Sequence, residues 1–471
     1  MPVDAFTSAR MRDEALRLFR SPDPRPVHFV GIAGAGMSAL AELFVRRGVG
    51  VTGSDLSAAG NADLDALAVT VHRGHDAAFV SGARAVVASS AIPADHVELK
   101  AATELGLPII RRAEALGAAV AGMHIIGIAG THGKTTTTVM TTEALAGTTA
   151  APTGIVGGRV QRWGGNLRWG GGDTVVVEAD EFDRSFLALH PTIAVITNVE
   201  ADHLDIYKDL DDIRATFAQY VADAKGIVLC ADDAGAESVL LPDTADVVRY
   251  GLDHPDARLV GITHGETMRV IFDGAPLGDL VLKVPGEHNR RNALAALGAG
   301  LLLGYAFTDL RPGLEAFSGV ERRFELKGEA CEVLVIDDYA HHPTEVRATL
   351  QAARAAYPGR RIVTLFQPHL FTRTRDFAEE FGAALAENSD LIALTDIYKA
   401  RETPIDGVSS QLIADAATRS GHAPEWHGLR ADATEAVLGL LLPHDVVLTM
   451  GAGDVTHVGQ ELLRALRGEP R

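Results

Sequence analysis

The stretch Ile125-Ile-Gly-Ile-Ala-Gly-Thr-His-Gly-Lys-Thr-Thr-Thr137 carries the strongest structural signal in the chain. Its β-branched start predicts a strand over residues 124–129, its glycines predict a turn, and the Lys-Thr pair opens a helix predicted over residues 135–146. In such an arrangement several backbone N–H groups and a helix N-terminus face one anion. The sequence therefore predicts a phosphate-binding loop at the end of a buried strand.

Individual residues of this loop have predicted roles in binding ATP. Lys134 is expected to reach the β- and γ-phosphates, and the Thr135 hydroxyl is expected to bind a Mg²⁺ ion. The common P-loop pattern has a glycine where this chain has Ile128, so the full pattern is not met. The segment Gly130-Thr-His-Gly-Lys-Thr keeps the part of the pattern that holds phosphate. A glycine turn with a surface lysine is the alternative interpretation.

A second glycine-rich turn follows the strand predicted over residues 27–32. Gly34-x-Gly36-x-x-Ala39, with Asp55 placed 19 residues beyond Gly36, satisfies the dinucleotide fingerprint. Its physical basis is a pyrophosphate at a helix N-terminus and a carboxylate on a ribose hydroxyl. A UDP-sugar presents both groups, as NAD does. The turn therefore predicts a bound nucleotide diphosphate without choosing which one, and a purely structural turn is the alternative.

Acidic side chains follow two further predicted strands of the central part. Glu178 ends the strand predicted over residues 174–178, and Glu200-Ala-Asp-His203 comes just after the strand that ends at Thr197-Asn198. Ligands bind at the carboxyl ends of strands in open α/β sheets. Oxygen ligands with one imidazole suit Mg²⁺ on phosphates better than structural zinc. Solvated acidic loops are the alternative interpretation.

The segments at residues 285–293 and 320–325 carry candidate nucleotide contacts. Asn289 and Asn292 open a helix predicted over residues 289–303, and their amides suit a purine edge, although N-capping is the alternative for Asn289. Arg323 lies at a predicted domain boundary. An arginine there can move onto a transferring phosphate when domains close, and an ordinary salt bridge is the alternative.

Two segments of the C-terminal part place polar groups after predicted strands. They are Asp337-Asp-Tyr-Ala-His-His-Pro343 and Phe366-Gln-Pro-His-Leu-Phe-Thr-Arg-Thr374, and both are expected to face one crevice. The adjacent His341 and His342 could be a metal pair. The following Pro343 and the lack of nearby thiols disfavour that interpretation.

The order of predicted elements indicates an α/β protein with three domains. Short β-branched runs alternate with alanine- and leucine-rich helical stretches, as in parallel sheets covered by helices. We predict a Rossmann-like nucleotide domain at 1–113, a P-loop-type ATPase domain at 114–324, and a Rossmann-like domain at 325–471. Residues 246–284 have shorter, polar strands and predict a small antiparallel insertion.

Composition excludes several classes of function. The 471 residues have a formal net charge of −19, which argues against a nucleic-acid or anionic-membrane binder. Cys230 and Cys331 form no disulfide framework and no metal spacing. No signal peptide or membrane-spanning run is evident. We expect a cytoplasmic enzyme that is a monomer or a weak homodimer.

Taken together, the motifs resemble those of the Mur ligases of peptidoglycan synthesis, in the right order along nearly the whole chain. The resemblance rests on His28-Phe-Val-Gly-Ile-Ala-Gly-Ala-Gly-Met-Ser38, Thr52-Gly-Ser-Asp55, Ser89-Ser-Ala-Ile92, Gly130-Thr-His-Gly-Lys-Thr-Thr-Thr137, Glu178-Ala-Asp-Glu181, Thr197-Asn198, Asp202-His203, His288-Asn289 with Asn292-Ala293, Arg322-Arg-Phe-Glu325, Asp337-Asp-Tyr-Ala-His-His-Pro343 and Phe366-Gln-Pro-His369. Met37-Ser38 and the Phe366 segment are most similar to the alanine-adding members.

The resemblance implies a reaction in two steps. The lactyl carboxylate of UDP-N-acetylmuramate attacks the γ-phosphate of ATP, and the amine of L-alanine then attacks the resulting acyl phosphate. The implied catalytic residues are Lys134, Glu178, His203, Arg323 and His341, and the implied Mg²⁺ ligands are Thr135, Glu178 and His203. The implied ATP contacts are Gly130, Thr131, His132, Gly133, Lys134, Thr135, Thr136, Asn289, Asn292, Arg323, Asp337 and Asp338. The implied substrate contacts are Gly34, Ala35, Gly36, Met37, Ser38, Ser54, Asp55, Ser89, Ser90, Thr197, Asn198, Tyr339, His341, His369 and Arg373.

One departure from the family pattern affects the amino-acid pocket. The family often has arginine where this chain has Leu370, so Arg373 is expected to carry more of the contact with the alanine carboxylate. Rival interpretations are a recycling ligase that adds a tripeptide to the same UDP-sugar, and a folylpolyglutamate synthetase. An NAD-dependent dehydrogenase and a non-catalytic nucleotide-binding module explain fewer of the motifs.

Overall fold

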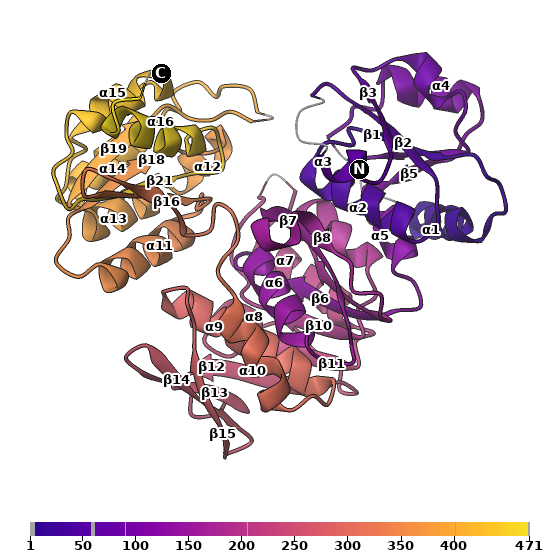
Figure 1. Cartoon of the computed structure of the whole chain (residues 1–471), viewed down its shortest axis with the longest axis horizontal. Coiled ribbons are helices and arrows are strands. Elements are labelled where there is room, and N and C mark those ends of the chain that lie inside the picture. The colour runs from indigo at the N-terminus through magenta and orange to yellow at the C-terminus, as the bar shows by residue number, and fades with distance from the viewer. Residues whose placement is uncertain (1–4, 58–61, 90, 205, 401, 470–471) are drawn as a thin grey trace. The chain divides into compact units, whose positions relative to one another are not determined.

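The computed structural model describes residues 5–57, 62–89, 91–204, 206–400 and 402–469, and these residues form three β-sheets with their helices (Figure 1). They divide into two compact units, Met1–Val281 with Arg291–Phe317, and Leu282–Arg290 with Ser318–Arg471. The first unit contains the N-terminal and central sheets. The boundary expected at residue 114 lies inside helix α5, and that at residue 325 lies at the start of strand β16.

The N-terminal sheet is parallel throughout, with the strand order β3-β2-β1-β4-β5. Ala85 and Val87 of β4 face one apolar core while Val86 and Ala88 face another, so the strand is buried on both faces. That pattern explains its continuous apolar sequence. The elements are α1 (Ala5–Arg20), β1 (Val27–Val30), α2 (Ala35–Arg46), β2 (Val51–Asp55), α3 (Ala62–Asp65), β3 (Thr70–Arg73), η1 (Ala77–Val80), β4 (Ala85–Ala88), α4 (Val97–Glu104), β5 (Ile109–Arg111) and α5 (Arg112–Ala119).

The central sheet has the order β15-β14-β13-β12-β11-β10-β6-β9-β7-β8. Its middle strands are parallel, whereas β8 pairs with β7 in antiparallel fashion. The elements are β6 (His124–Ala129), α6 (Lys134–Leu145), β7 (Thr153–Val160), η2 (Gln161–Trp163), β8 (Gly165–Arg168), β9 (Thr174–Glu178), η3 (Phe182–Ala188), β10 (Ile193–Ile196), α7 (Leu210–Val221), β11 (Gly226–Cys230), α8 (Ala234–Glu237), β12 (Asp246–Leu252), β13 (Leu259–His264), β14 (Thr267–Phe272), β15 (Ala275–Val281), α9 (Glu287–Leu302) and α10 (Phe307–Ala316).

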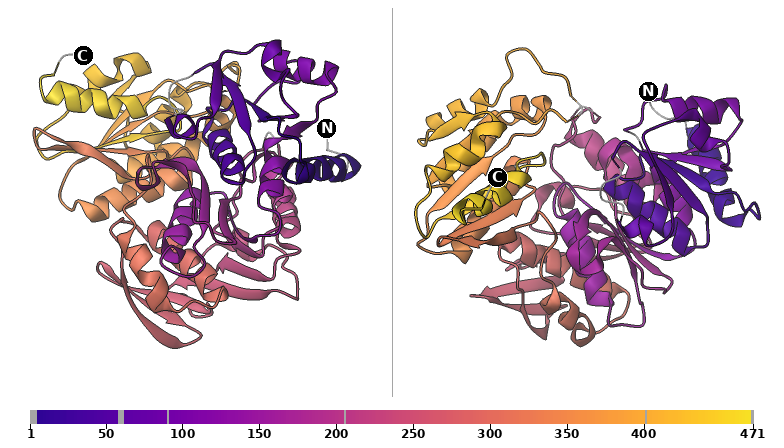
Figure 2. Two further views of the ribbon diagram at one scale, coloured as in Figure 1. Left: turned by 45° about the vertical axis from the view of Figure 1, so that its right-hand side comes forward. Right: turned by 45° about the horizontal axis from the view of Figure 1, so that its top comes forward.

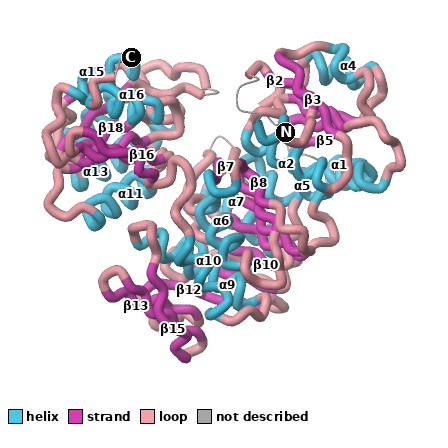
Figure 3. Tube along the Cα trace, in the orientation of Figure 1, coloured by secondary structure: helices cyan, strands magenta, loops and turns pink. Residues whose placement is uncertain are grey.

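The antiparallel insertion expected at residues 246–284 is only partly correct. Strands β13, β14 and β15 are antiparallel, but β12 pairs in parallel with both β11 and β13. All four strands extend the central sheet and are joined by loops without helices (Figure 3). The sequence pattern predicted that no helices lie between these strands. It did not predict which edge of the central sheet the strands extend.

The C-terminal sheet has the order β16-β17-β21-β18-β19-β20, and only β16 is antiparallel to its neighbour. Val335 faces one core and Leu334 and Ile336 face the other, so helices cover both sides of the sheet (Figure 2). The segment between β18 and β19 forms two helices, α12 and α13. The elements are β16 (Glu325–Ala330), β17 (Val333–Asp338), α11 (Pro343–Ala356), β18 (Ile362–Phe366), α12 (Phe371–Asp376), α13 (Ala378–Asn388), β19 (Leu391–Thr395), α14 (Gln411–Arg419), β20 (Trp426–Gly428), η4 (Arg430–Asp432), α15 (Ala433–Leu438), β21 (Val446–Met450) and α16 (Thr456–Leu466).

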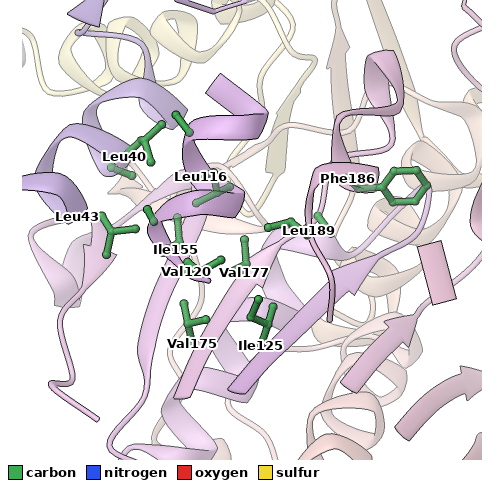
Figure 4. Packing of buried hydrophobic residues seen from close by; sticks show 14 of the residues in the cluster. Leu40, Leu43, Leu116, Val120, Ile125, Ile155, Val175, Val177, Phe186 and Leu189 are labelled. Atoms are coloured by element: carbon green, nitrogen blue, oxygen red, sulfur yellow. The ribbon is translucent and has the colours of Figure 1, made fainter. Parts of the chain in front are cut away.

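One apolar core joins the N-terminal sheet to the central sheet inside the first unit. Leu40 and Leu43 of α2 and Leu116 of α5 lie in the same buried cluster as Ile155 of β7 and Val177 of β9 (Figure 4). Hydrophobic burial of this kind resists separation of the layers that it joins. The N-terminal and central sheets are therefore joined by apolar packing. In the described residues no helix is long and apolar enough to cross a membrane.

The contact of α5 with η3 depends on a glycine. A Cβ added to Gly117 would lie 2.4 Å from the carbonyl oxygen of Ala188, and a backbone atom cannot easily move away. We expect Gly117→Ala to lower the free energy of unfolding by about 1–3 kcal/mol, as overpacking does. Gly147→Ala is the matched control, because no atom lies within 4 Å of its added Cβ. Urea titration of both variants checks this, and equal stabilities would contradict the close approach.

Candidate active site

The central glycine loop has the predicted strand–turn–helix form, and its two glycines are sterically required. Gly130 has φ 138° and Gly133 has φ 80°, a region that residues with side chains rarely occupy. A Cβ on Gly130 would lie 2.1 Å from Thr197 Oγ1, and one on Gly133 would lie 2.7 Å from Asn292 Oδ1. The loop therefore lies directly against its neighbours, with Gly133 as the N-cap of α6.

The residues that follow β10 hold the loop in place. The Asn198 side chain accepts a hydrogen bond from the His132 N–H at 2.7 Å and donates one to the His132 carbonyl at 3.1 Å. Thr197 Oγ1 donates to the same carbonyl at 2.6 Å, and the Thr131 N–H donates to the Asn198 carbonyl at 3.1 Å. Thr197 and Asn198 therefore shape the phosphate loop, and their contact with substrate stays a prediction.

Lys134 is paired with Glu181, which sequence reasoning left out of the site. Its Nζ lies 3.0 Å from Glu181 Oε1 and 2.8 Å from Oε2, and it also donates to the carbonyls of Gly130 at 2.7 Å and Thr131 at 3.1 Å. Burial alone would lower the pKa of Lys134, but the carboxylates of Glu181 and Asp180 outweigh it and raise the pKa to about 12. The lysine is therefore a cation at neutral pH. Burial raises the pKa of Glu181 to about 7, with the Lys134 ammonium acting against this rise.

Thr135 and Glu178 meet beside the loop, as predicted. Thr135 Oγ1 donates to Glu178 Oε1 at 2.8 Å, and Glu178 Oε2 accepts a hydrogen bond from the Gly157 N–H at 2.6 Å. The result is a pair of oxygen donors next to the phosphate loop. Hard divalent cations such as Mg²⁺ prefer this donor chemistry, so the residues present fit the expected ion.

His203 also lies beside the lysine, in a strained backbone conformation. Its φ is 53°, and such a conformation costs about 1–3 kcal/mol in a residue other than glycine. The ring Nε2 lies 3.8 Å from Glu181 Oε1 and 3.8 Å from Asp202 Oδ2, and the ring contacts Phe182 edge to face. The surrounding structure thus holds the imidazole next to the Lys134–Glu181 pair. This agrees with the expectation that two strand ends bring these groups together.

The other side chains of the first unit and of helix α9 that are predicted to contact ATP differ in their surroundings. Asn292 is buried beside Gly133, next to the loop. Asn289 is also buried, and its Nδ2 donates to the Pro285 carbonyl at 2.7 Å, so the amide secures the start of α9. Thr136 is buried in the first turn of α6. Of these three side chains, only that of Asn292 lies against a glycine of the loop, where a nucleotide is expected to bind.

The first glycine loop exposes two of its five predicted residues. Gly34 is the N-cap of α2 with no side-chain cap, and Gly34 and Ala35 are exposed. Ser38 Oγ donates to the Ala35 carbonyl at 3.1 Å. The Met37 side chain is only 3% exposed and belongs to the core, and its contact with substrate stays a prediction.

The Asp55 carboxylate holds the loops on either side of it. One oxygen accepts from the Ala33 N–H at 2.9 Å and the other accepts from the Ser57 N–H at 3.0 Å. Each carboxylate oxygen has a second lone pair, so a ribose contact is still compatible with this geometry. The Ser89 carbonyl accepts from the Ile92 N–H at 3.2 Å. Ser90 lies outside the described residues.

Ser54 belongs to a buried polar network in this part of the chain. Its side chain is fully buried, and Oγ donates to Glu98 Oε2 at 2.7 Å. The same carboxylate is within hydrogen-bond distance of His28 Nε2 at 3.2 Å and of His75 Nδ1 at 3.0 Å. Burial raises the pKa of Glu98, but these hydrogen bonds outweigh it and hold the pKa below its usual value. Ser54 therefore holds this internal network together with Glu98, and its contact with substrate stays a prediction.

Asp337, expected to contact nucleotide, is fully buried in the C-terminal sheet. Its carboxylate accepts hydrogen bonds from Thr449 Oγ1 and Thr456 Oγ1, both at 2.7 Å. Arg322 Nε lies 3.3 Å from the same carboxylate, so the arginine that pairs here is Arg322 and not its neighbour. Protein atoms already surround this carboxylate, and its contact with nucleotide stays a prediction.

Asp338 has a similar internal role. It accepts from the N–H groups of Phe324 and Ala340, both at 2.7 Å. Burial raises the pKa of Asp338 to about 6, while the nearby Arg323 guanidinium acts in the opposite direction. The carboxylate ties the segment before β16 to the end of β17. Its contact with nucleotide also stays a prediction.

Arg323 and His341 gather around Tyr339 and Glu345. Arg323 lies 5.1 Å from the centre of the Tyr339 ring and 3.6 Å from Glu345 Oε1. His341 Nδ1 lies 3.0 Å from the Tyr339 carbonyl and 3.2 Å from Glu345 Oε2. A proton on Nδ1 satisfies both contacts and leaves Nε2 as the acceptor of a neutral imidazole. The ring of His369 lies 5.8 Å away.

Leu370, which stands where the family often has arginine, lies at the start of helix α12. Leu370 has φ 73° and a buried side chain, and it is the N-cap of α12. Its side chain therefore packs into the protein and offers no group to a ligand. Arg373 is 5% exposed, and His369 stacks on Tyr398 at 5.8 Å. The predicted amino-acid contacts Tyr339, His341 and His369 are near one another in this unit.

The fold and the central site together define an α/β nucleotide-binding protein with a phosphoryl-transfer centre, because a phosphate loop, a buried lysine and paired oxygen ligands meet at strand ends. Three family profiles match the chain in order. They are described as "Mur ligase family, catalytic domain" over residues 26–124, "Mur ligase middle domain" over 128–300 and "Mur ligase, glutamate ligase domain" over 322–453.

Individual relatives cover nearly the whole chain. A UDP-N-acetylmuramate–L-alanine ligase of Salinibacter ruber is 44% identical over 94% of this chain and 96% of its own. One of Paenarthrobacter aurescens is 45% identical over 94% of this chain and 97% of its own. The crystal structure of a UDP-N-acetylmuramate-alanine ligase from Thermotoga maritima matches with TM-score 0.79 and 28% identity, covering 94% of this chain and 99% of that one. The protein belongs to the Mur ligase family, and it is an ATP-dependent ligase.

Mutation can test how much the buried Lys134–Glu181 pair contributes to the stability of the protein. Removing one partner of a buried pair leaves the other charge uncompensated, and we expect Glu181→Ala to lower the free energy of unfolding by about 3–5 kcal/mol. Glu181→Gln should lose less, because its amide oxygen still accepts a hydrogen bond from Nζ. The control is Asp279→Ala, which breaks the exposed pair of Asp279 with Arg269 and should cost at most about 1 kcal/mol. Urea unfolding at neutral pH measures all three, and equal losses for Glu181→Ala and Asp279→Ala would contradict the buried pair.

Proposed function

We propose that the protein joins L-alanine to the lactyl carboxylate of UDP-N-acetylmuramate, at the expense of ATP, to give ADP, phosphate and the UDP-linked alanyl product used in peptidoglycan synthesis. The observation that carries this proposal is the meeting of Lys134, Thr135 and Glu178 at the central loop. The relatives that share this architecture at 44–45% identity are named for that reaction.

The first step is transfer of a phosphoryl group to the substrate. A carboxylate oxygen attacks the γ-phosphorus, an O–P bond forms, and the bond from the γ-phosphorus to the β,γ-bridging oxygen breaks, which leaves an acyl phosphate and ADP. The buried and protonated Lys134 places positive charge where negative charge builds up on the transferring group. The backbone N–H groups of the loop hold the phosphates in position.

A Mg²⁺ ion suits the donors at the loop. Thr135 Oγ1 and Glu178 Oε1 would hold it, and we assign His203 as a third group near it. When bound, such an ion neutralises phosphate charge and orients the transferring group. Glu181 keeps Lys134 at the loop, and Thr197 with Asn198 keeps the loop in its shape.

The second step is attack of the alanine amine on the acyl phosphate. The nitrogen forms a C–N bond through a tetrahedral intermediate, phosphate leaves, and the amine loses a proton. We assign alanine binding to the cluster of Tyr339, His341, His369 and Arg373 in the C-terminal unit. His341 suits acceptance of that proton, because its Nδ1 faces the Tyr339 carbonyl and Glu345 and its Nε2 remains the acceptor.

We also propose that the enzyme works in the cytoplasm as a monomer or weak homodimer. Its substrates ATP and a UDP-sugar are small molecules, and the net charge of −19 disfavours nucleic acid and anionic membranes as partners. Both cysteines are free thiols, with Cys230 buried and Cys331 exposed, which suits a reducing compartment.

Phosphate release tests the substrates directly. We expect the purified protein to release phosphate from ATP only when UDP-N-acetylmuramate and L-alanine are both present, because the second substrate completes the turnover. The assay compares L-alanine, glycine, L-serine and the tripeptide L-alanyl-γ-D-glutamyl-meso-diaminopimelate. Release with the tripeptide but not with alanine would assign the recycling reaction to the chain and overturn the proposal.

Lys134→Ala separates the ATP site from the UDP-sugar site. We expect turnover to fall by at least about a thousandfold, because the variant loses the charge that stabilises the transferring phosphoryl group. Glu181 can take up a proton when its partner is removed, since its pKa is already raised to about 7, so the fold should persist. Binding of UDP-N-acetylmuramate, measured by titration calorimetry, should stay close to wild type. Loss of that binding in a folded variant would show that the two sites are not separate.

A further inference from the structure

A small cavity in the first unit connects the first glycine loop with the phosphoryl-transfer site. Its volume is about 60 Å³, and its lining includes Gly36, Arg112, Gly157, Glu178 and Asp180. Gly36 belongs to the loop predicted to hold a nucleotide diphosphate, whereas Glu178 belongs to the central site. Residues of both loops therefore line the same cavity.

Arg112 is the cation of the cavity, and it lies against the glycine loop. A Cβ added to Gly36 would be 2.9 Å from Arg112 Nη1 and 3.4 Å from Cζ, so the guanidinium occupies the space that the glycine leaves open. Within the described part of the chain, the side chain of Arg112 makes no hydrogen bond and no ion pair. The carboxylate of Glu178, which also lines the cavity, is instead engaged by Thr135 and by the Gly157 N–H.

Two features indicate that Arg112 contributes little to the stability of the folded protein. Arg112 is the first residue of α5, where a positive charge is unfavourable next to the positive end of the helix dipole. Its neighbours Leu40, Leu116, Ile155 and Val156 form apolar walls of the cavity. Apolar walls lower the local dielectric constant, so an unpaired cation there attracts an incoming anion strongly.

We propose that the Arg112 guanidinium binds the diphosphate of the UDP-linked substrate, at the point where that substrate leaves the first glycine loop for the central site. The guanidinium lies directly against Gly36 of the loop, so its charge is close to an anion bound there. Glu178 and Asp180, which also line the cavity, carry negative charge and do not attract an anion. The planar fork of arginine matches two phosphate oxygens at once. This rests on the proposed function for the identity of the nucleotide.

Equilibrium binding of UDP and of UDP-N-acetylmuramate tests the assignment. We expect Arg112→Ala to weaken both by about 10- to 100-fold, as loss of a charge-assisted contact does. Arg112→Lys should recover part of the loss, because it keeps the charge and loses the fork. ATP binding should stay within about twofold of wild type, since Lys134 and its loop are unchanged.

Arg111→Ala is the matched control. It removes the same charge one residue earlier, from an exposed side chain that does not line the cavity. Thermal unfolding of each variant shows whether the fold persists, and Arg112→Lys provides the comparison if Arg112→Ala is unstable. Equal losses for Arg111→Ala and Arg112→Ala would overturn the proposal in favour of a general charge effect.

The two ligands distinguish the diphosphate from the carboxylate of the sugar. If UDP binds Arg112→Ala as tightly as wild type and only UDP-N-acetylmuramate is weakened, the arginine binds the sugar acid and the assignment to the diphosphate is wrong. Failure of the wild-type protein to bind UDP would instead contradict the proposed function. Weaker binding of UDP to Arg112→Ala, together with turnover of alanine by the wild-type protein, supports both the assignment of Arg112 and the proposed function.

Discussion

The turn between β6 and α6 is the constraint on which the rest of the site depends. Gly130 and Gly133 adopt left-handed backbone conformations, and the residues after β10 hold the turn through both the N–H and the carbonyl of His132. A turn held in this way keeps its remaining N–H groups directed at a phosphate without reorganisation on binding. It also fixes the first turn of α6, and with it the positions of Lys134 and Thr135.

The buried charges around that turn follow from its geometry. Lys134 is directed back over the loop, where the carbonyls of Gly130 and Thr131 and the carboxylate of Glu181 surround its ammonium group. Without a ligand, this arrangement satisfies a cation that the burial would otherwise disfavour. A bound nucleotide then enters a site whose charge is already in position, so little of its binding energy is spent on moving the lysine.

The apolar core between α2, α5 and the central strands has a functional consequence. It joins the N-terminal and central sheets so that the first glycine loop and Glu178 share one cavity. Neither sheet alone contains both the loop proposed to bind the UDP-linked substrate and the proposed phosphoryl-transfer site. The covalent chemistry that the family performs needs the two substrates side by side, and hydrophobic packing supplies that proximity.

Local sequence determined the elements and the chemistry of the loops, because β-branched runs, glycines and a Lys-Thr pair act over a few residues. Strand β9 ending at Glu178 and the loop at Gly130 are examples. The partners of individual side chains came only from the tertiary structure. Ser54 has the polarity of a ligand contact but is buried on Glu98, and Met37 lies in the core. Glu181 lies 47 residues from Lys134, and no local pattern reveals which distant carboxylate will meet a buried lysine.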